Sequence, residues 1–415
     1  MVSAVSTTET LVEPPKILTV REVYSPPSAA TSNGRIVPIQ HGPDSKADFG
    51  AEIYGIDLNS FTSADFAFIS DALHRHKLLV FKQQPVMLKP QQQYRLTACF
   101  DPEEKKGGFA HGADPVLLTT EKGITIYGLP NRPALNEQPQ VHILGRGELP
   151  QNYFDFPAGF KVKGIDHVNF HIPPHIPQEE REKGASRFYQ WHWDGSLYDI
   201  PPPRVGCLLA VRTPKGPDVT VQWGDGSGRT MKIAPGATAM VAGSRALELL
   251  DAETRDIVMH SRIEYAPHAF QWMSTARSAQ LGHILKTEGR EVPLDQLRDW
   301  SEDRICVYPM VWTNPVTGEK SLQVHGQGAF KLYLKNGPGG EEIVVSDLKE
   351  VREFMHKVMS PVLSPENIYA HPHQEGDVIL WYNRALWHSI TEFPESYGPR
   401  VMHQCNIAAS DHPSG

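Results

Sequence analysis

The chain has 415 residues, of which 40% are apolar and 21% charged, an ordinary composition for a soluble globular protein. A net charge of −8 provides no basic surface for nucleic acid, and no apolar run approaches the roughly 18 residues that span a bilayer. The four cysteines form no C-x-x-C pair, which predicts a reducing compartment, the cytoplasm, and argues against a zinc ribbon or a disulfide scaffold.

Two regions differ in composition. Residues 1–34 are rich in Ser, Thr, Pro and Ala and show little apolar periodicity, so we expect a disordered or loosely attached tail. Residues 35–415 contain no internal repeat and no obvious boundary, and we expect them to form a single domain. The expected partner is a small molecule, and an anionic one would need a locally placed cation.

The first predicted elements follow the tail. Phe49–Leu58 has the pattern of a strand that enters a turn. Thr62, three residues before Asp65, is a candidate helix N-cap, and a core-facing stripe follows at helical spacing: Phe66, Ile69 and Leu73. The apolar run Leu78–Phe81 has the length of a strand.

From Gln138 onwards the pattern is mostly short strands broken by Pro, Gly and Asn. The predicted strands are Arg204–Thr213, Val219–Trp223, Thr238–Ala242, Ile305–Trp312 and Val378–Tyr382. Asn314–Gly318 has the composition of a turn, and Ser346 is a candidate cap for a second amphipathic helix, whose stripe is Leu348, Val351, Met355 and Val358. Many short strands with few helices predict a mainly β fold, an antiparallel barrel or sandwich with flanking helices.

A candidate metal site begins at His192 and Asp194. In a strand or extended turn, residues i and i+2 point to the same side, so this pair can present an imidazole and a carboxylate to one point. Two histidines and one carboxylate on one octahedral face form the facial triad of non-haem iron(II) oxygenases. An isolated H-x-D pair is weak evidence, since a surface His and a turn Asp give the same pattern.

The C-terminal part of the chain supplies the missing groups. Gly376-Asp377 begins a strand, Asn383-Arg384 forms a turn, and His388 is expected at the end of the next short strand. Arg400 follows twelve residues later, a spacing typical of the distal ligand and the co-substrate cation of 2-oxoglutarate oxygenases. An arginine suits that role because its planar fork matches a carboxylate bidentately.

Two other motifs resemble functional sites, one a metal-binding cluster and one a phosphate loop. His371-Pro372-His373-Gln374-Glu375 could bind a metal, although no anchoring strand is expected before it. Gly224–Gly228 suggests a phosphate loop but lacks the G-K-[ST] signature, so a hairpin turn is the preferred interpretation.

At these residues the chain resembles the taurine dioxygenase-like family of Fe(II)/2-oxoglutarate oxygenases. The resemblance also covers Phe49–Leu58, His76–Gln84, Asn383-Arg384 and Arg400–His403, in patches from about residue 49 to 410. It implies a double-stranded β-helix (a cupin-like jelly roll), with His192, Asp194 and His388 as Fe(II) ligands and catalytic centre. It also implies 2-oxoglutarate and O2 as co-substrates.

The resemblance assigns further positions. Thr238, in Pro235–Gly243, is the expected partner of Arg400 at the distal carboxylate of 2-oxoglutarate. Sulfonate-binding members carry a second Arg four residues after the first, whereas this chain has Gln404, which disfavours a sulfonate. Gln404 and Asn406 share a strand face with Arg400, and their amides suit a neutral, hydrogen-bonding heterocycle.

Within the family the chain is similar to the fungal xanthine dioxygenases, at Phe188–His192, Leu197–Asp199, Ile263–His268, Met310–Trp312 and Gln404–Ser410. This similarity implies oxidation of xanthine to urate with release of succinate and CO2, and it suggests three more substrate contacts, Gln140, Lys163 and Glu180. The alternatives are the same chemistry on an amino acid or a secondary-metabolite intermediate, a non-catalytic jelly-roll binding protein, and a zinc hydrolase built on His371–Glu375.

Overall fold

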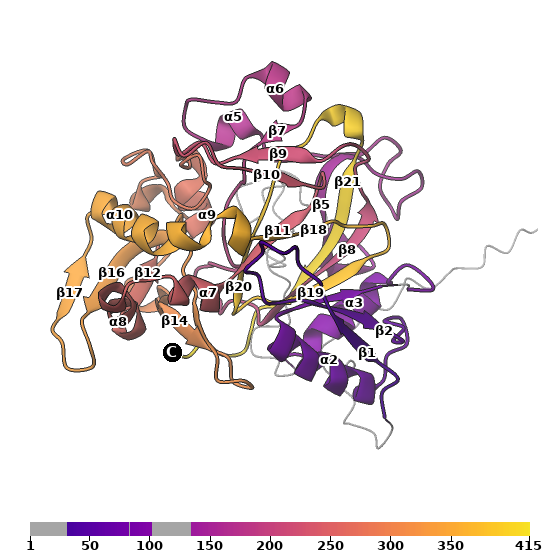
Figure 1. Cartoon of the computed structure of the whole chain (residues 1–415), viewed down its shortest axis with the longest axis horizontal. Coiled ribbons are helices and arrows are strands. Elements are labelled where there is room, and N and C mark those ends of the chain that lie inside the picture. Colours follow the sequence, from indigo (N-terminus) through magenta and orange to yellow (C-terminus); the bar gives the residue numbers. More distant parts are fainter. Residues whose placement is uncertain (1–30, 83, 102–133) are drawn as a thin grey trace, which may run out of the picture.

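The computed structural model describes residues 31–82, 84–101 and 134–415, so most of the predicted tail lies outside the described residues. Within this part of the chain, the largest sheet runs in the order β1-β2-β3-β19-β8-β21-β5-β4, and β6 pairs with β5 (Figure 1). The strands are β1 (Arg35–Pro38), β2 (Ala51–Tyr54), β3 (Leu78–Phe81), β4 (Ala134–Leu135), β5 (Gln138–Glu148), β6 (Lys161–Val162), β8 (Val205–Arg212), β19 (Val378–Tyr382) and β21 (Arg400–Asn406).

This sheet is covered on both faces, which explains its sequence. Every residue of β19 is buried, and the strand is accordingly a continuous apolar run rather than an alternating one. One face packs against two helices, α2 (Ser63–His76) and α3 (Pro90–Ala98). The other face packs against a three-stranded sheet, β18-β11-β20, formed by β11 (Thr238–Ala242), β18 (Tyr369–His371) and β20 (Leu386–Ile390).

These two packed sheets are consistent with the predicted jelly roll. Met240 of β11 and Leu386 of β20 meet Leu208, Trp381 and Met402 of the large sheet in one buried cluster. A second small sheet, β10-β9-β7, contains β7 (Ala185–Ser186), β9 (Val219–Gln222) and β10 (Thr230–Ile233). β9 and β10 form an antiparallel hairpin around Gly224–Gly228, so the hairpin interpretation of that glycine-rich segment is confirmed.

The remaining elements form the left part of the molecule in Figure 1. A four-stranded sheet, β13-β12-β16-β17, and a hairpin, β14-β15, contain β12 (Arg262–Tyr265), β13 (Val307–Pro309), β14 (Val311–Thr313), β15 (Lys320–Leu322), β16 (Ala329–Lys335) and β17 (Glu342–Val345). The helices of the same region are α7 (Gly243–Glu248), α8 (Ala252–His260), α9 (Ala269–Trp272) and α10 (Leu348–Met359). Two shorter helices lie near β7 and β9, α5 (His167–Phe170) and α6 (Gln178–Glu182).

Short 3-10 turns complete the described elements. They are η1 (Met273–Thr275), η2 (Leu294–Gln296), η3 (Glu302–Arg304), η4 (Ser360–Val362), η5 (Pro365–Asn367) and η6 (Glu395–Tyr397).

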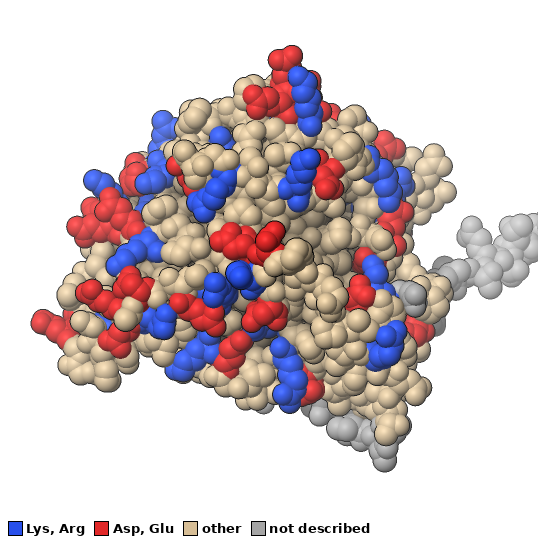
Figure 2. Space-filling model, in the orientation of Figure 1, with Lys and Arg blue, Asp and Glu red and all other residues tan. Residues whose placement is uncertain are grey.

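On the face shown in Figure 2, acidic and basic side chains are interspersed. None of the helices in the described ranges has the length and apolar composition needed to cross a bilayer.

Several local predictions are confirmed. Thr62 caps α2 and forms a reciprocal capping box with Asp65, a contact worth about 1 kcal/mol. Ile69 and Leu73 are buried as the helical stripe requires. β3, β11 and β19 have the predicted bounds.

Other predictions need correction by one or a few residues. Asp347, not Ser346, caps α10, because its carboxylate accepts from the backbone N–H groups of the first turn. The expected strand 305–312 is divided between β13 and β14, which pair with different partners. His388 lies in the middle of β20 rather than at its end, and β18 places an anchoring strand at His371, where none was expected.

Candidate metal centre and active-site cavity

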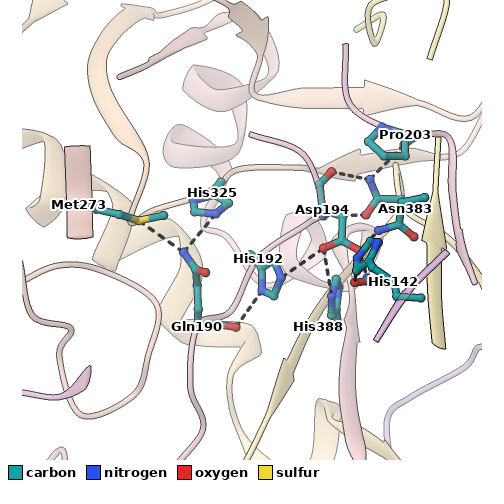
Figure 3. Close-up of polar contacts among 11 residues, drawn as sticks. His142, Gln190, His192, Asp194, Pro203, Met273, His325, Asn383 and His388 are labelled. Carbon is teal, nitrogen blue, oxygen red and sulfur yellow. Dashed lines mark hydrogen bonds and ion pairs between the residues drawn. The ribbon is translucent and has the colours of Figure 1, made fainter. Parts of the chain in front are cut away.

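Three side chains converge where β20 meets the segment before β8. His192, Asp194 and His388 each offer one ligand atom, and these atoms all lie within 4.8 Å of one another. Asp194 Oδ1 is 3.4 Å from His192 Nε2 and 3.6 Å from His388 Nε2 (Figure 3). It is the only such group of metal-binding residues found in the described part of the chain. Two imidazoles and one carboxylate oxygen suit a divalent iron ion.

The backbone fixes the two histidines against each other. His192 N donates to His388 O at 3.1 Å, and His388 N donates to His192 O at 2.8 Å. This pair is an isolated antiparallel bridge, so both imidazoles point to the same side. His192 Nδ1 donates to the carbonyl of Gln190 at 2.9 Å, which leaves the Nε2 lone pair free for a metal.

The side chain of Asn383 holds Asp194 in place by binding the backbone of Asp194. The Asn383 side chain is fully buried, and its Oδ1 accepts from Asp194 N at 2.8 Å. Its Nδ2 donates to the carbonyls of Asp194 and Pro203, at 2.8 and 3.0 Å. Both backbone groups of a metal ligand are therefore bound by one side chain, which itself comes from the turn between β19 and β20. The sequence placed Asn383 in a turn and in the family resemblance but assigned it no role at the metal centre.

The second carboxylate oxygen of Asp194 is occupied by two amides of β21. Gln404 Nε2 donates to Asp194 Oδ2 at 3.0 Å, and Asn406 Nδ2 donates to the same atom at 2.6 Å. Gln404 Oε1 lies 3.2 Å from His142 Nε2. Two N–H donors on Oδ2 leave Oδ1 as the atom that faces the histidines. These contacts orient the carboxylate, a role that the sequence did not assign to Gln404 and Asn406.

Burial keeps His388 in the form that binds a metal. His388 is 6% exposed, and its burial lowers the imidazole pKa to about 3. At neutral pH one of its ring nitrogens therefore retains a lone pair for coordination.

A cavity of about 340 Å³ opens beside the three ligands. Its wall includes Gln190, Lys163, Phe270, Gln404 and Arg400, together with His192, Asp194, His388 and Thr238. The cavity is therefore bounded by the metal-binding group and by a buried cation.

Arg400 enters the cavity without a carboxylate partner among the described residues. It is 5% exposed; its Nε donates to Gly236 O at 2.8 Å and one terminal nitrogen donates to Thr238 Oγ1 at 3.3 Å. Gly236 has φ +73°, which allows its turn to present that carbonyl. Burial lowers the pKa of Arg400 to about 10, so the guanidinium remains charged at neutral pH. A buried, charged and unpaired arginine fits an anionic ligand.

The competing histidine cluster does not converge. His371 Nε2 lies 3.6 Å from Asp377 Oδ2, whereas His373 Nε2 lies 2.8 Å from Thr238 Oγ1. Glu375 Oε1 is 3.9 Å from Arg212 Nε and from Lys215 Nζ. Within the described residues these three side chains do not form a metal-binding group, since each has a different set of partners.

The remaining substrate candidates are placed differently from one another. Lys163 lines the cavity. Gln140 lies on β5 and accepts from Gln138 Nε2 at 2.5 Å, outside the cavity wall. Glu180 is exposed on α6, where it accepts from Gln222 Nε2 at 3.5 Å, so the structure does not bring it to the cavity. The sequence did not predict a role for Gln190, which lines the cavity. Gln190 lies two residues before His192, and in an extended segment that spacing places the two side chains on the same side.

Comparison with known proteins identifies the family of the chain. The model of the family "Taurine catabolism dioxygenase TauD, TfdA family" matches residues 38–406. An alpha-ketoglutarate-dependent xanthine dioxygenase of Emericella nidulans is 39% identical over 376 residues, which cover 91% of this chain and 97% of that protein. The protein of the same description from Schizosaccharomyces pombe is 37% identical over 419 residues, covering 100% and 98%.

Solved structures support the fold alone. The crystal structure of AAD-2 in complex with Mn(II) and N-oxalylglycine is similar with a TM-score of 0.51 at 15% identity, over 92% of this chain and 100% of that one.

Proposed function

Because the chain belongs to the TauD/TfdA family of dioxygenases, and is thus a 2-oxoglutarate-dependent non-haem iron dioxygenase, we propose that its reaction is the oxidation of xanthine to urate. In this reaction one oxygen atom of O2 enters urate and the other enters succinate, while 2-oxoglutarate loses CO2. The observation that carries the proposal is the identity of 37–39% to xanthine dioxygenases over nearly the whole length of both chains.

The iron ligands in this proposal are His192, Asp194 and His388. The donor set fits Fe(II), and three ligands on one side leave further coordination positions for co-substrates. The bound iron would supply the oxidising chemistry with 2-oxoglutarate and O2. Asn383, Gln404 and Asn406 would orient the carboxylate ligand, since they occupy its backbone groups and its second oxygen.

The co-substrate residues are Arg400 and Thr238. Arg400 carries a buried charge that has no acidic partner among the described residues, and Thr238 places a hydroxyl beside it. A dicarboxylate that reaches from the metal to Arg400 would satisfy that charge with hydrogen bonds. The guanidinium and hydroxyl would thereby fix one end of 2-oxoglutarate while its other end meets the iron.

Substrate would occupy the rest of the cavity, beside His192. A volume of about 340 Å³ suits a small molecule rather than a polymer. Lys163 remains the substrate candidate with direct access to this space, while Gln404 also lines it but donates its amide N–H to Asp194.

We also propose a reducing, cytoplasmic setting, in keeping with the free thiols of Cys99, Cys207, Cys306 and Cys405.

The test is succinate formation by the purified protein with Fe(II), 2-oxoglutarate and O2, across xanthine, related purines and amino acids. Succinate and urate that increase together only with xanthine would support the proposal. Succinate formed with an amino acid and not with xanthine would refute the substrate while keeping the class. An Asp194→Ala preparation is the matched control, because it lacks the carboxylate ligand and should give neither product.

A further inference from the structure

Gln190 is a cavity residue whose amide has an incomplete set of partners. Its side chain lines the cavity two residues before His192. Figure 3 shows one end of the amide beside His325 and Met273. With the amide nitrogen on this side, as in Figure 3, Gln190 Nε2 lies 3.3 Å from His325 Nε2 and 3.6 Å from Met273 Sδ. The other amide atom has no hydrogen-bond partner among the described residues, and it is not sealed from the cavity.

The tautomer of His325 decides which amide atom faces it. Gly328 N donates to His325 Nδ1 at 3.0 Å, and a backbone nitrogen can only donate, so Nδ1 carries a lone pair. An imidazole always keeps at least one proton, which must then be on Nε2. His325 is fully buried among aromatic rings, including Trp193 and Tyr265, and reversing its ring would turn a carbon towards the Gly328 N–H.

This assignment orients the Gln190 amide. If its nitrogen faced His325, two N–H donors would meet at 3.3 Å, whereas the contact to Met273 sulfur is only a weak bond. A half-turn of the amide exchanges its nitrogen and oxygen. Gln190 Oε1 then accepts from His325 Nε2, and the NH2 group points away from His325, towards the side where His192 lies in Figure 3.

We propose that Gln190 is a specificity-determining residue whose NH2 group, held in place by His325, donates a hydrogen bond to a carbonyl oxygen of the substrate. The inference rests on the proposed function in identifying that oxygen as one of the two carbonyls of xanthine. A fixed donor in the cavity wall disfavours substrates that lack the matching acceptor, because the bound substrate would leave the donor unpaired. His325 acts through Gln190 and is a positioning residue.

The experiment measures xanthine binding by calorimetry to protein loaded with Mn(II) and N-oxalylglycine, which cannot turn over. Gln190→Glu keeps the shape and the acceptor for His325 but removes the donor. Gln190→Leu removes the donor without adding charge. Gln296→Glu, an exposed position in η2, makes the same change of charge outside the cavity. Both Gln190 variants should weaken xanthine binding by about 10- to 100-fold, while Gln296→Glu should not.

Purines that lack one carbonyl identify the acceptor. Hypoxanthine has no oxygen at C2, and 2-hydroxypurine has none at C6. For one of these two ligands, wild-type protein and Gln190→Leu should bind equally, because the hydrogen bond is already absent. Mn(II) and N-oxalylglycine affinities should stay within about twofold of wild type in every variant, which excludes a folding defect.

The results separate this inference from the proposed function. Wild-type protein that binds no xanthine would refute the proposed function. It would also refute the statement that Gln190 donates to a carbonyl oxygen of xanthine. Wild-type protein that binds xanthine, together with Gln190→Leu that binds it equally well, would refute the role of Gln190 and leave the function standing.

Discussion

Asn383→Leu tests how far one buried amide supports the metal centre. Asn383 makes three hydrogen bonds, of 2.8, 2.8 and 3.0 Å, to Asp194 N, Asp194 O and Pro203 O. Leucine has a similar volume, so the variant should leave no large cavity. It would leave three buried backbone groups unpaired, each costing about 1–2 kcal/mol, so the free energy of unfolding should fall by about 3–6 kcal/mol.

The same change should weaken metal binding. Asn383 fixes the backbone of Asp194 on both sides, so its loss frees the carboxylate to leave the geometry that faces His192 and His388. Loss of such supporting contacts typically lowers metal affinity by about 10- to 100-fold. Urea denaturation of the metal-free protein measures the stability, and titration with Mn(II) at 4 °C, where the variant should stay folded, measures the affinity.

Asn314→Leu is the matched control. Asn314 is 4% exposed and also makes three side-chain hydrogen bonds, to His74 O, Val316 N and Thr317 N. None of these partner atoms belongs to a candidate metal ligand. It should lose stability to a similar extent but keep the Mn(II) affinity of the wild type. Equal Mn(II) affinity in both variants would refute the role assigned to Asn383.

Three further predictions concern the co-substrate, pH and the metal. Arg400→Met should weaken N-oxalylglycine binding by about 10- to 100-fold, and Thr238→Val by less, with Mn(II) affinity unchanged; calorimetry that finds no loss for Arg400→Met would remove it from this role. Burial lowers the pKa of His283 to about 3, so the unfolded state binds more protons between about pH 6.5 and 3, and stability should fall as pH falls through this window. His283→Gln should therefore reduce the loss of stability between pH 6.5 and 5 by up to about 2 kcal/mol in urea denaturation, and an unchanged loss would contradict the assignment. Removing the metal with a chelator should abolish succinate formation, and Fe(II) should restore it in wild type but not in Asp194→Ala, as followed by succinate assay.

Local sequence patterns predicted the elements whose signals are local. The stripe of α2, its Thr62 cap and the apolar run of β19 depend on residues next to one another in the chain, and the structure has them where expected. The cap of α10 was misplaced by one residue because Ser346 and Asp347 are both good capping residues. The strand at His371 was missed because its pairing partner, β11, lies more than 120 residues away.

In the site, too, features set by local sequence were predicted, and contacts between distant segments were not. Spacing and side-chain chemistry sufficed to propose His192, Asp194 and His388, which the structure brings together. The contacts of Gln404 and Asn406 with Asp194 depend on how β21 lies against the segment before β8, and no pattern within β21 reveals it. The orientation of the Gln190 amide likewise depends on a backbone N–H at Gly328, far along the chain.

The most direct test of the proposed reaction is a single turnover assay in 18O2 with xanthine, Fe(II) and 2-oxoglutarate, followed by mass spectrometry of both products. We expect equal amounts of urate and succinate, each carrying one 18O atom. Succinate without urate, or urate without the label, would contradict the account.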